Sequence, residues 1–152
     1  MGRADELGGG AADREKGCEL MSGSVTFEYD QVRNIVFTED RWEIRTREDV
    51  IAFFAEYVKY FRALDKKVYM VSDIDELRVH AEVADYYGET ARSTVGQYLL
   101  GFARYGRKDL SRMTVRTSSL KAKLPSNIYS DREAAVQAVE EMKKEKPGGE
   151  SV

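Results

Sequence analysis

Apolar and polar residues alternate in two segments near the start of the chain, residues 25–29 and 35–37. A period of two residues is typical of a strand with one face against a core, so these segments predict a hairpin that turns through 31–34. Trp42 and Ile44 flank a glutamate in the same way, and they predict that the sheet continues through 42–44.

The next segment has the period of an amphipathic helix. Thr46 is a favourable N-cap, and the acids of Thr46-Arg-Glu-Asp49 lie where the helix dipole attracts negative charge. Apolar residues then recur at helical spacing as far as Leu64. They are Val50, Phe53, Phe54, Tyr57, Val58, Tyr60 and Phe61. The pattern predicts a helix over 46–64 with a wide apolar face.

Signals for strands and helices alternate from there to the end of the chain. The continuous apolar run Val68-Tyr-Met-Val71 is typical of a strand covered on both faces. The remaining segments are a helix within 75–95, a strand over 98–103, a helix over 110–124, a strand over 127–129 and a helix over 130–144. The order ββαβαβαβα favours an α/β fold with a central mixed, mostly parallel sheet flanked by helices.

The last two helices differ in their faces. Helix 110–124 carries Met113, Thr117, Leu120 and Leu124 along one face and ends before Pro125. In the last helix, Ser130-Asp-Arg-Glu133 predicts a capping box. Its apolar face consists of Ala134, Ala135, Ala138, Val139 and Met142.

The ends of the chain lack any such pattern. Residues 1–22 contain three successive glycines and scattered charges, and we expect a disordered tail there, with Met21 as a candidate for the true start. Residues 24–144 are expected to form a single domain. The segment 145–152, which begins with Glu145-Lys-Pro147-Gly148-Gly149, is expected to be a flexible C-terminal tail.

Composition narrows the class of protein. The net charge of −3 gives no global attraction to nucleic acid or anionic membrane. The N-terminus has no apolar segment of the kind found in secretion signals, and no apolar run is long enough to span a bilayer. A single cysteine, Cys18, excludes an intramolecular disulfide and suits a reducing compartment. We therefore expect a cytoplasmic protein.

An acidic cluster follows the apolar run at 68–71. Asp73-x-Asp75 after a strand resembles the nucleophile and magnesium ligand of aspartyl-phosphate enzymes. Such an enzyme also needs a Ser or Thr after a second strand, a downstream lysine and a further acidic pair, and the later strand ends supply no acidic pair. The alternative is that Asp73 or Asp75 caps the following helix. We favour this structural role, while a carboxylate-only magnesium site that includes Glu76 stays open.

Other catalytic chemistry finds little support. His80 is the only histidine, so a zinc site of the His/Cys type cannot be assembled and a Ser-His-Asp triad would depend on this one residue. The glycines do not form a phosphate-binding loop. We therefore predict no cofactor, no metal and no catalytic residue.

Charge is distributed unevenly in the second half of the chain. Basic residues dominate 104–123, and we predict a partner-binding or anion-binding surface there. Its members are Arg104, Arg107, Lys108, Arg112, Arg116 and Lys123, joined by Lys121. The stretch 73–89 is acidic, which also permits head-to-tail self-association. Tyr86 and Tyr87 form a second candidate interface, since tyrosine is enriched at protein interfaces and two adjacent helical residues point about 100° apart.

The end of the chain resembles the STAS-like (SpoIIAA-like) domains of bacteria. The resemblance rests on the strand Phe102-Ala-Arg-Tyr105, a polar helix and LPSNIYSDREAAVQAVEEM, residues 124–142. It implies a STAS-like fold over roughly 24–143, as in anti-sigma-factor antagonists. Those proteins bind a partner kinase and are phosphorylated on a serine of an Asp-Ser-Ser/Thr-Gly motif. Here the corresponding residues are Ser72-Asp-Ile-Asp75, so the phosphoswitch does not carry over.

Together these observations predict a non-enzymatic regulatory or protein-interaction module of STAS-like type. Its partner is another protein or a second copy of the chain, and the scarcity of aromatic residues among the basic ones argues against nucleic acid. The alternatives are a small-ligand or lipid- or phosphate-binding domain and an enzyme that uses Asp73 and Asp75.

Overall fold

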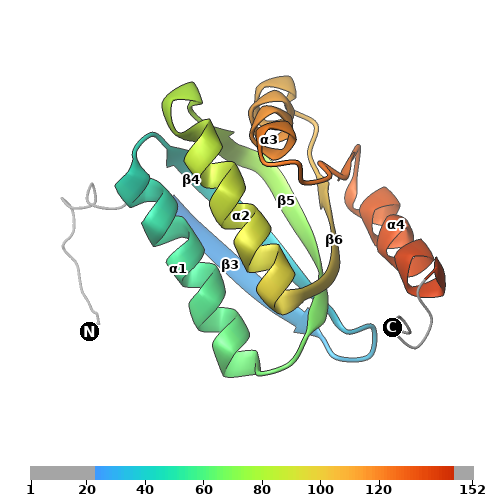
Figure 1. Ribbon diagram of the computed structural model, residues 1–152. Helices are drawn as coiled ribbons and strands as arrows, with labels where there is room; N and C mark the ends of the chain where they lie inside the picture. Colours follow the sequence, from blue (N-terminus) through green and yellow to red (C-terminus); the bar gives the residue numbers. More distant parts are fainter. Residues whose placement is uncertain (1–22, 146–152) are drawn as a thin grey trace.

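The computed structural model describes residues 23–145. The predicted N-terminal tail, the candidate start at Met21 and Cys18 lie outside these residues, and so does the predicted C-terminal tail except for Glu145, which is the last residue of a helix. The elements are the strands β3 (Gly23–Asp30), β4 (Ile35–Ile44), β5 (Val68–Val79), β6 (Leu99–Tyr105) and β7 (Ile128–Tyr129), the helices α1 (Arg47–Leu64), α2 (Ala84–Tyr98), α3 (Asp109–Lys121) and α4 (Arg132–Glu145), and a short 3₁₀ helix, η1 (Ala81–Val83). Figure 1 shows their arrangement.

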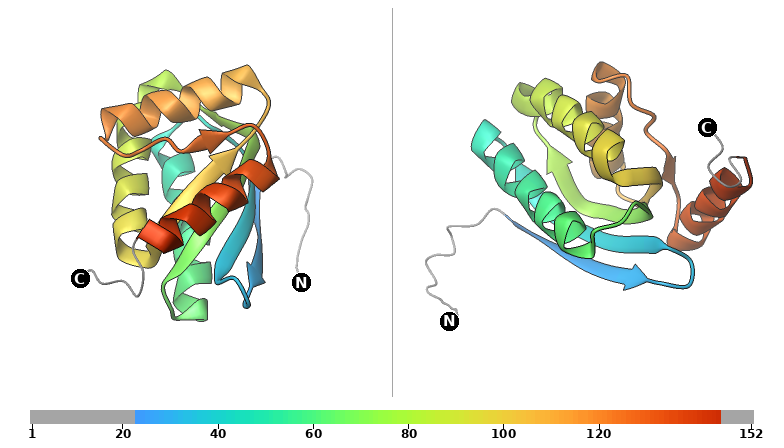
Figure 2. Two further views of the ribbon diagram at one scale, coloured as in Figure 1. Left: turned by 90° about the vertical axis from the view of Figure 1, so that its right-hand side faces the viewer. Right: turned by 60° about the horizontal axis from the view of Figure 1, so that its bottom comes forward.

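The strands form one five-stranded sheet in the order β3-β4-β5-β6-β7. β3 and β4 are an antiparallel hairpin, and every later neighbour is parallel. From β4 onward, each new strand pairs with the previous one on the same side. Right-handed connections between these parallel strands therefore place α1, α2 and α3 on the same face of the sheet. α4 follows the last strand and covers the opposite face (Figure 2). The predicted α/β class and the element order are confirmed.

Each face of the sheet has its own core. The larger core lies under α1, α2 and α3 and is rich in aromatic rings, with Phe53 and Phe61 almost fully buried. The smaller core lies under α4, where Ala135 and Val139 pack against Phe37 and its neighbours. The apolar faces predicted for the first and last helices are therefore the faces that pack.

The helix starts follow the predicted capping chemistry in one case and depart from it in the other. The Thr46 side chain accepts a hydrogen bond from the Asp49 N–H, and the Asp49 side chain accepts one from the Thr46 N–H, which completes a capping box for α1. At α4 the cap is Asp131 rather than Ser130, because its carboxylate accepts the Ala134 N–H at 2.8 Å. Asp131 directly precedes the first residue of α4, Arg132, whereas Ser130 lies one residue further away.

β5 is longer than predicted and corrects the placement of the acidic cluster. It runs from Val68 to Val79, so Asp73 and Asp75 lie inside the strand rather than at its end. The register against β4 shifts there, with Glu39 opposite Asp73 and Arg41 opposite Glu76. An extra residue in β5 forms this irregularity, and acidic residues have low strand propensity, which is why the sequence pattern concealed the continuation.

α3 presents its apolar face to solvent, which corrects the expectation from the sequence. Its buried residues are small: Ser111, Val115, Ser118 and Ser119. The apolar residues of its outer side are Leu110, Met113 and Leu120, exposed by 42%, 54% and 68%. Small inward residues bring α3 close to the sheet and to α2, where a Cβ added to Gly88 would lie 2.3 Å from the Ser118 carbonyl oxygen.

Candidate functional site

The acidic residues of β5 have structural partners. Asp73 accepts the Asp75 N–H at 3.0 Å, and burial raises the pKa of the Asp73 carboxyl. Asp75 accepts the N–H groups of Arg107 and Lys108, at 2.6 and 3.1 Å from the same oxygen. It thus holds the loop before α3, not a helix that follows its own strand. Within residues 23–145, no three His, Cys, Asp or Glu side chains are grouped as a metal site.

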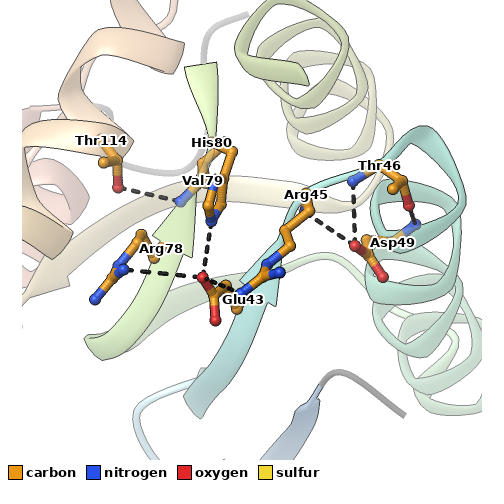
Figure 3. A network of polar contacts seen from close by, with 8 residues as sticks. All are labelled: Glu43, Arg45, Thr46, Asp49, Arg78, Val79, His80 and Thr114. Carbon is orange, nitrogen blue, oxygen red and sulfur yellow. Dashed lines mark hydrogen bonds and ion pairs between the residues drawn. The ribbon is translucent and has the colours of Figure 1, made fainter. Parts of the chain in front are cut away.

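Figure 3 shows a polar network at the carboxyl ends of β4 and β5, centred on Glu43. The Glu43 carboxylate lies 2.8 Å from His80 Nε2, 3.0 Å from Arg45 Nη2 and 3.8 Å from Arg78 Nη1. Hydrogen bonds from His80 and Arg45 hold the pKa of Glu43 below its usual range. Within the described part of the chain no serine, threonine or cysteine bonds to the His80 ring, so these residues form no catalytic triad.

The basic segment divides into buried, paired and unpaired residues. Arg104 is only 6% exposed and lies inside the molecule, so it cannot contact a docked protein, contrary to the prediction. Lys108 pairs with Glu76, and Lys121 pairs with Asp85 at 3.3 Å. Two acidic residues of 73–89 therefore pair with basic residues of 104–123, and the two stretches do not form separate surfaces of opposite charge. Over residues 23–145, Arg107, Arg112, Arg116 and Lys123 make no ion pair.

The unpaired cations and the exposed apolar residues of α3 form one surface, which we name the α3 surface. It consists of Leu110, Met113 and Leu120 together with Arg107, Arg112, Arg116 and Lys123. Arg112, Arg116 and Leu120 follow one another at a spacing of four residues, and Met113 lies three residues before Arg116. Residues three and four apart are neighbours on a helix, so apolar and basic groups lie side by side.

The two adjacent tyrosines point in different directions. Tyr87 is buried, 4% exposed, and packs against Phe53 and Phe54 of α1. Tyr86 is partly exposed, and the Arg47 guanidinium lies 4.4 Å from its ring centroid. Only Tyr86 is available to a partner.

A buried polar cluster, which the sequence analysis missed, lies between the sheet and the helices α1 and α2. The strand register places Thr38 opposite Ser72 and Ser72 opposite Arg104, so that three strands contribute one polar row. Asp40, Tyr57 and Tyr87 complete the cluster, and all six residues are buried. A signal was present, because Thr38 and Asp40 lie on the period-two face of β4 that also carries Val36 and Trp42.

Hydrogen bonds join part of this cluster. Thr38 Oγ1 lies 3.1 Å from Asp40 Oδ1 and 2.7 Å from Ser72 Oγ, and the Tyr57 hydroxyl donates to the same Asp40 oxygen. Burial raises the pKa of Asp40 to about 6, although these hydrogen bonds and the charge of Arg104 act in the opposite direction. Arg104 donates to Ser119 Oγ at 2.8 Å, and burial lowers the pKa of its guanidinium.

A small cavity adjoins the cluster, with a volume of about 30 Å³. Asp40, Ser72, Tyr87 and Arg104 line its polar side. Its apolar side includes Phe61, Met70, Val95, Leu99 and Phe102. The geometry therefore offers two candidate sites, the outer α3 surface and this cavity between the sheet and the helices α1 and α2.

Comparison with solved structures identifies the fold. The chain is similar to an anti-sigma factor antagonist from Mycobacterium paratuberculosis, with a TM-score of 0.51, 16% sequence identity, and coverage of 77% of this chain and 95% of the other. The fold is STAS-like. No family model and no curated protein matches the STAS-like chain in sequence.

The start of the helix that follows the third strand of this STAS-like domain differs from the phosphorylated motif. Its residues are His80-Ala-Glu-Val-Ala84, none of which carries a hydroxyl group. Ser72-Asp-Ile-Asp75, which the sequence aligned with the motif, lies in the interior of β5 and not at a helix start. Across residues 23–145, no helix has both the length and the apolar character that a bilayer crossing requires.

Proposed function

We propose that this STAS-like domain is a non-enzymatic regulatory module that binds a partner protein through the α3 surface. The observation that carries the proposal is the exposure of Leu110, Met113 and Leu120 beside four unpaired cations. The solved structure that this chain resembles is that of an anti-sigma factor antagonist, and this similarity supports a role in protein interaction.

The apolar residues supply the contact area of this surface. A helix in a folded domain normally turns such side chains inward, whereas α3 turns serines inward and leaves its larger apolar residues in water. Burying apolar area contributes about 25 cal/mol per Å². Met113 is well suited to an adaptable interface because its side chain is unbranched and polarisable.

The charges define the partner. Arg107, Arg112, Arg116 and Lys123 have no acidic neighbours in ion-pair contact within residues 23–145, so a bound partner can supply them. Two arginines four residues apart can both reach carboxylates on one surface. We infer that the partner presents an acidic segment with apolar anchors, such as an acidic amphipathic helix.

The test is affinity capture from the native host with the wild-type chain and the double variant Arg112→Glu, Arg116→Glu, followed by calorimetry on the captured partner. The variant reverses four units of charge at one exposed position, Arg116, and one partly exposed position, Arg112, and should fold normally. We expect its affinity for the partner to fall at least tenfold, and wild-type binding to weaken as salt rises, because exposed charges are screened beyond about 8 Å at physiological ionic strength.

A matched control makes the same change elsewhere. Lys59→Glu with Arg62→Glu also reverses four units of charge on an exposed helix face, that of α1. It should leave partner binding unchanged. Equal binding by the wild type and the α3 variant would transfer the interface to another surface, with Tyr86 as the next candidate. Binding of the wild type to vesicles rich in phosphatidylglycerol, without a protein partner, would replace the proposal by a membrane contact.

A further inference from the structure

The cavity between the sheet and the helices α1 and α2 has a polar end and an apolar end, and both follow from the strand register. One row across the sheet is apolar, with Val36 opposite Met70 and Met70 opposite Phe102. The next row on the same face is the polar row Thr38, Ser72 and Arg104. Since side chains two residues apart share a face, the two rows lie next to each other beneath α1 and α2.

The polar end has hydrogen-bonding capacity that the protein itself does not use. Both hydrogen bonds of the Asp40 carboxylate go to Oδ1, and Oδ2 has no partner among residues 23–145. The Tyr87 hydroxyl makes no hydrogen bond within the same residues, and Arg104 uses only Nη1. Among residues 23–145, Trp42 Nε1 is the only polar side-chain atom that is both fully buried and without a partner, so these groups of Asp40, Tyr87 and Arg104 are accessible from the cavity. They are placed to form hydrogen bonds with a molecule that enters it.

The charges select a neutral head group. An anion placed against Arg104 would also face the Asp40 carboxylate, and a cation placed against Asp40 would face the guanidinium. A neutral group that accepts a hydrogen bond from Arg104 or Tyr87 and donates one to Asp40 satisfies both ends. The apolar end, with Phe61, Met70 and Leu99, suits a short hydrocarbon body.

We propose that this cavity is a binding site for a small neutral amphipathic molecule, with a hydroxyl or amide head at Asp40, Tyr87 and Arg104 and a short apolar body directed toward Met70 and Leu99. A volume of about 30 Å³ holds water but not such a body, so binding requires the lining side chains to move. Met70 has three freely rotating bonds and is placed to make that room. This site is independent of the α3 surface.

The probe is a series of linear alcohols from ethanol to hexan-1-ol, added to the chain labelled with ¹³C at its methionine methyl groups. We expect saturable shifts of the Met70 methyl resonance and an affinity that rises with chain length. Met113, which is exposed on α3, serves as an internal reference and should not shift in a saturable way.

Two neighbouring tyrosines provide matched variants. Tyr87→Phe removes one hydroxyl that has no partner among residues 23–145, so the variant should fold and should bind hexan-1-ol about three- to tenfold more weakly, as expected for one lost hydrogen bond. Tyr86→Phe removes a hydroxyl outside the cavity lining and should bind like the wild type. Ala91→Leu fills the apolar side and should abolish binding.

The tyrosine pair decides the outcome even if Ala91→Leu does not fold. The absence of a saturable Met70 shift with every alcohol would overturn the proposal, and so would equal affinities of Tyr87→Phe and wild type. The charge-reversed α3 variant should bind hexan-1-ol normally, so a failure of the partner interaction and a failure of the cavity site are distinguishable.

Discussion

Asp40 is an acidic side chain at a buried position of the sheet, where apolar side chains are the norm. It lies on the buried face of β4 between Thr38 and Trp42, and no lysine or arginine lies within ion-pair distance of it among residues 23–145. Tyr57 and Thr38 bond to it from α1 and β4, while Arg104 and Asp73 act on it through their charges. A carboxyl group placed in this way is easier to bury protonated than ionised.

The stability of the protein should therefore depend on the protonation of Asp40. The pKa is raised from 3.8 to about 6, so the folded state binds this proton more tightly, and the stabilisation is present below pH 4 and lost as pH rises through about 6. The shift corresponds to roughly 2–3 kcal/mol. We expect the free energy of unfolding of Asp40→Asn minus that of wild type to rise by about this amount between pH 4 and pH 7.

Urea denaturation at several pH values measures this difference. Contributions from Glu43 and Asp73, whose pKa values are also shifted, cancel when the two proteins are compared. A difference between variant and wild type that does not change with pH would show that Asp40 has an ordinary carboxyl pKa.

A second residue prediction concerns the aromatic core. Phe61 is 1% exposed and packs against Tyr57 and Tyr98, so Phe61→Ala should lower the free energy of unfolding by roughly 3–5 kcal/mol. Thermal or urea denaturation gives the value. Exposed Ile51, on the same helix, provides the control, and Ile51→Ala should cost less than about 1 kcal/mol. A loss below 1 kcal/mol at Phe61 would contradict its place in the core.

At the scale of elements, α3 is positioned by polar contacts together with a single large apolar anchor, Val115. Asp75 accepts two backbone N–H groups from the loop before it, Ser111 Oγ donates to the Asp75 carbonyl oxygen at 2.9 Å, and Thr114 Oγ1 accepts the Val79 N–H at 3.2 Å. Gly88 allows α2 to approach it closely. With this arrangement Leu110, Met113 and Leu120 stay exposed.

Asp75→Ala tests the structural role of the acidic cluster. Two backbone donors lose their acceptor, so we expect a loss of about 1–3 kcal/mol in the free energy of unfolding. Glu76→Ala removes only an exposed ion pair with Lys108 and should cost less than about 0.5 kcal/mol. Magnesium should change neither value. Magnesium-dependent stabilisation of the wild type that disappears in Asp75→Ala would instead support a metal site.

At the scale of the whole molecule, the sheet is covered unequally. Three helices cover one face, whereas on the other face α4 forms the smaller core with Ile35, Phe37, Val71 and Ala103. These strand residues are almost completely buried, and they belong to the three central strands. Stability of the entire sheet therefore depends on the packing of one terminal helix.

Val139→Asp should disrupt this second face. Val139 is fully buried in α4, and an unpaired carboxylate there should lower the free energy of unfolding by roughly 3–5 kcal/mol. Gln137→Asp places the same charge on the exposed side of the same helix, where it loses the hydrogen bond to Glu141, and should cost less than about 1 kcal/mol. Size-exclusion chromatography and denaturation distinguish them. Equal stability of both variants would mean that α4 does not cover the sheet.

The sequence by itself determined the order of the elements, the hairpin, the cap of α1 and the α/β class, because periodicity and capping depend on residues close together in the chain. The outward face of α3, the length of β5 and the pairing of Lys108 with Glu76 and Lys121 with Asp85 were decided only by tertiary structure. So was the buried polar row, since Thr38, Ser72 and Arg104 become neighbours only through the register of three parallel strands. Parallel strands are joined by long connections that contain a helix, so no short turn sets their register, and it depends on how side chains distant in the chain pack together.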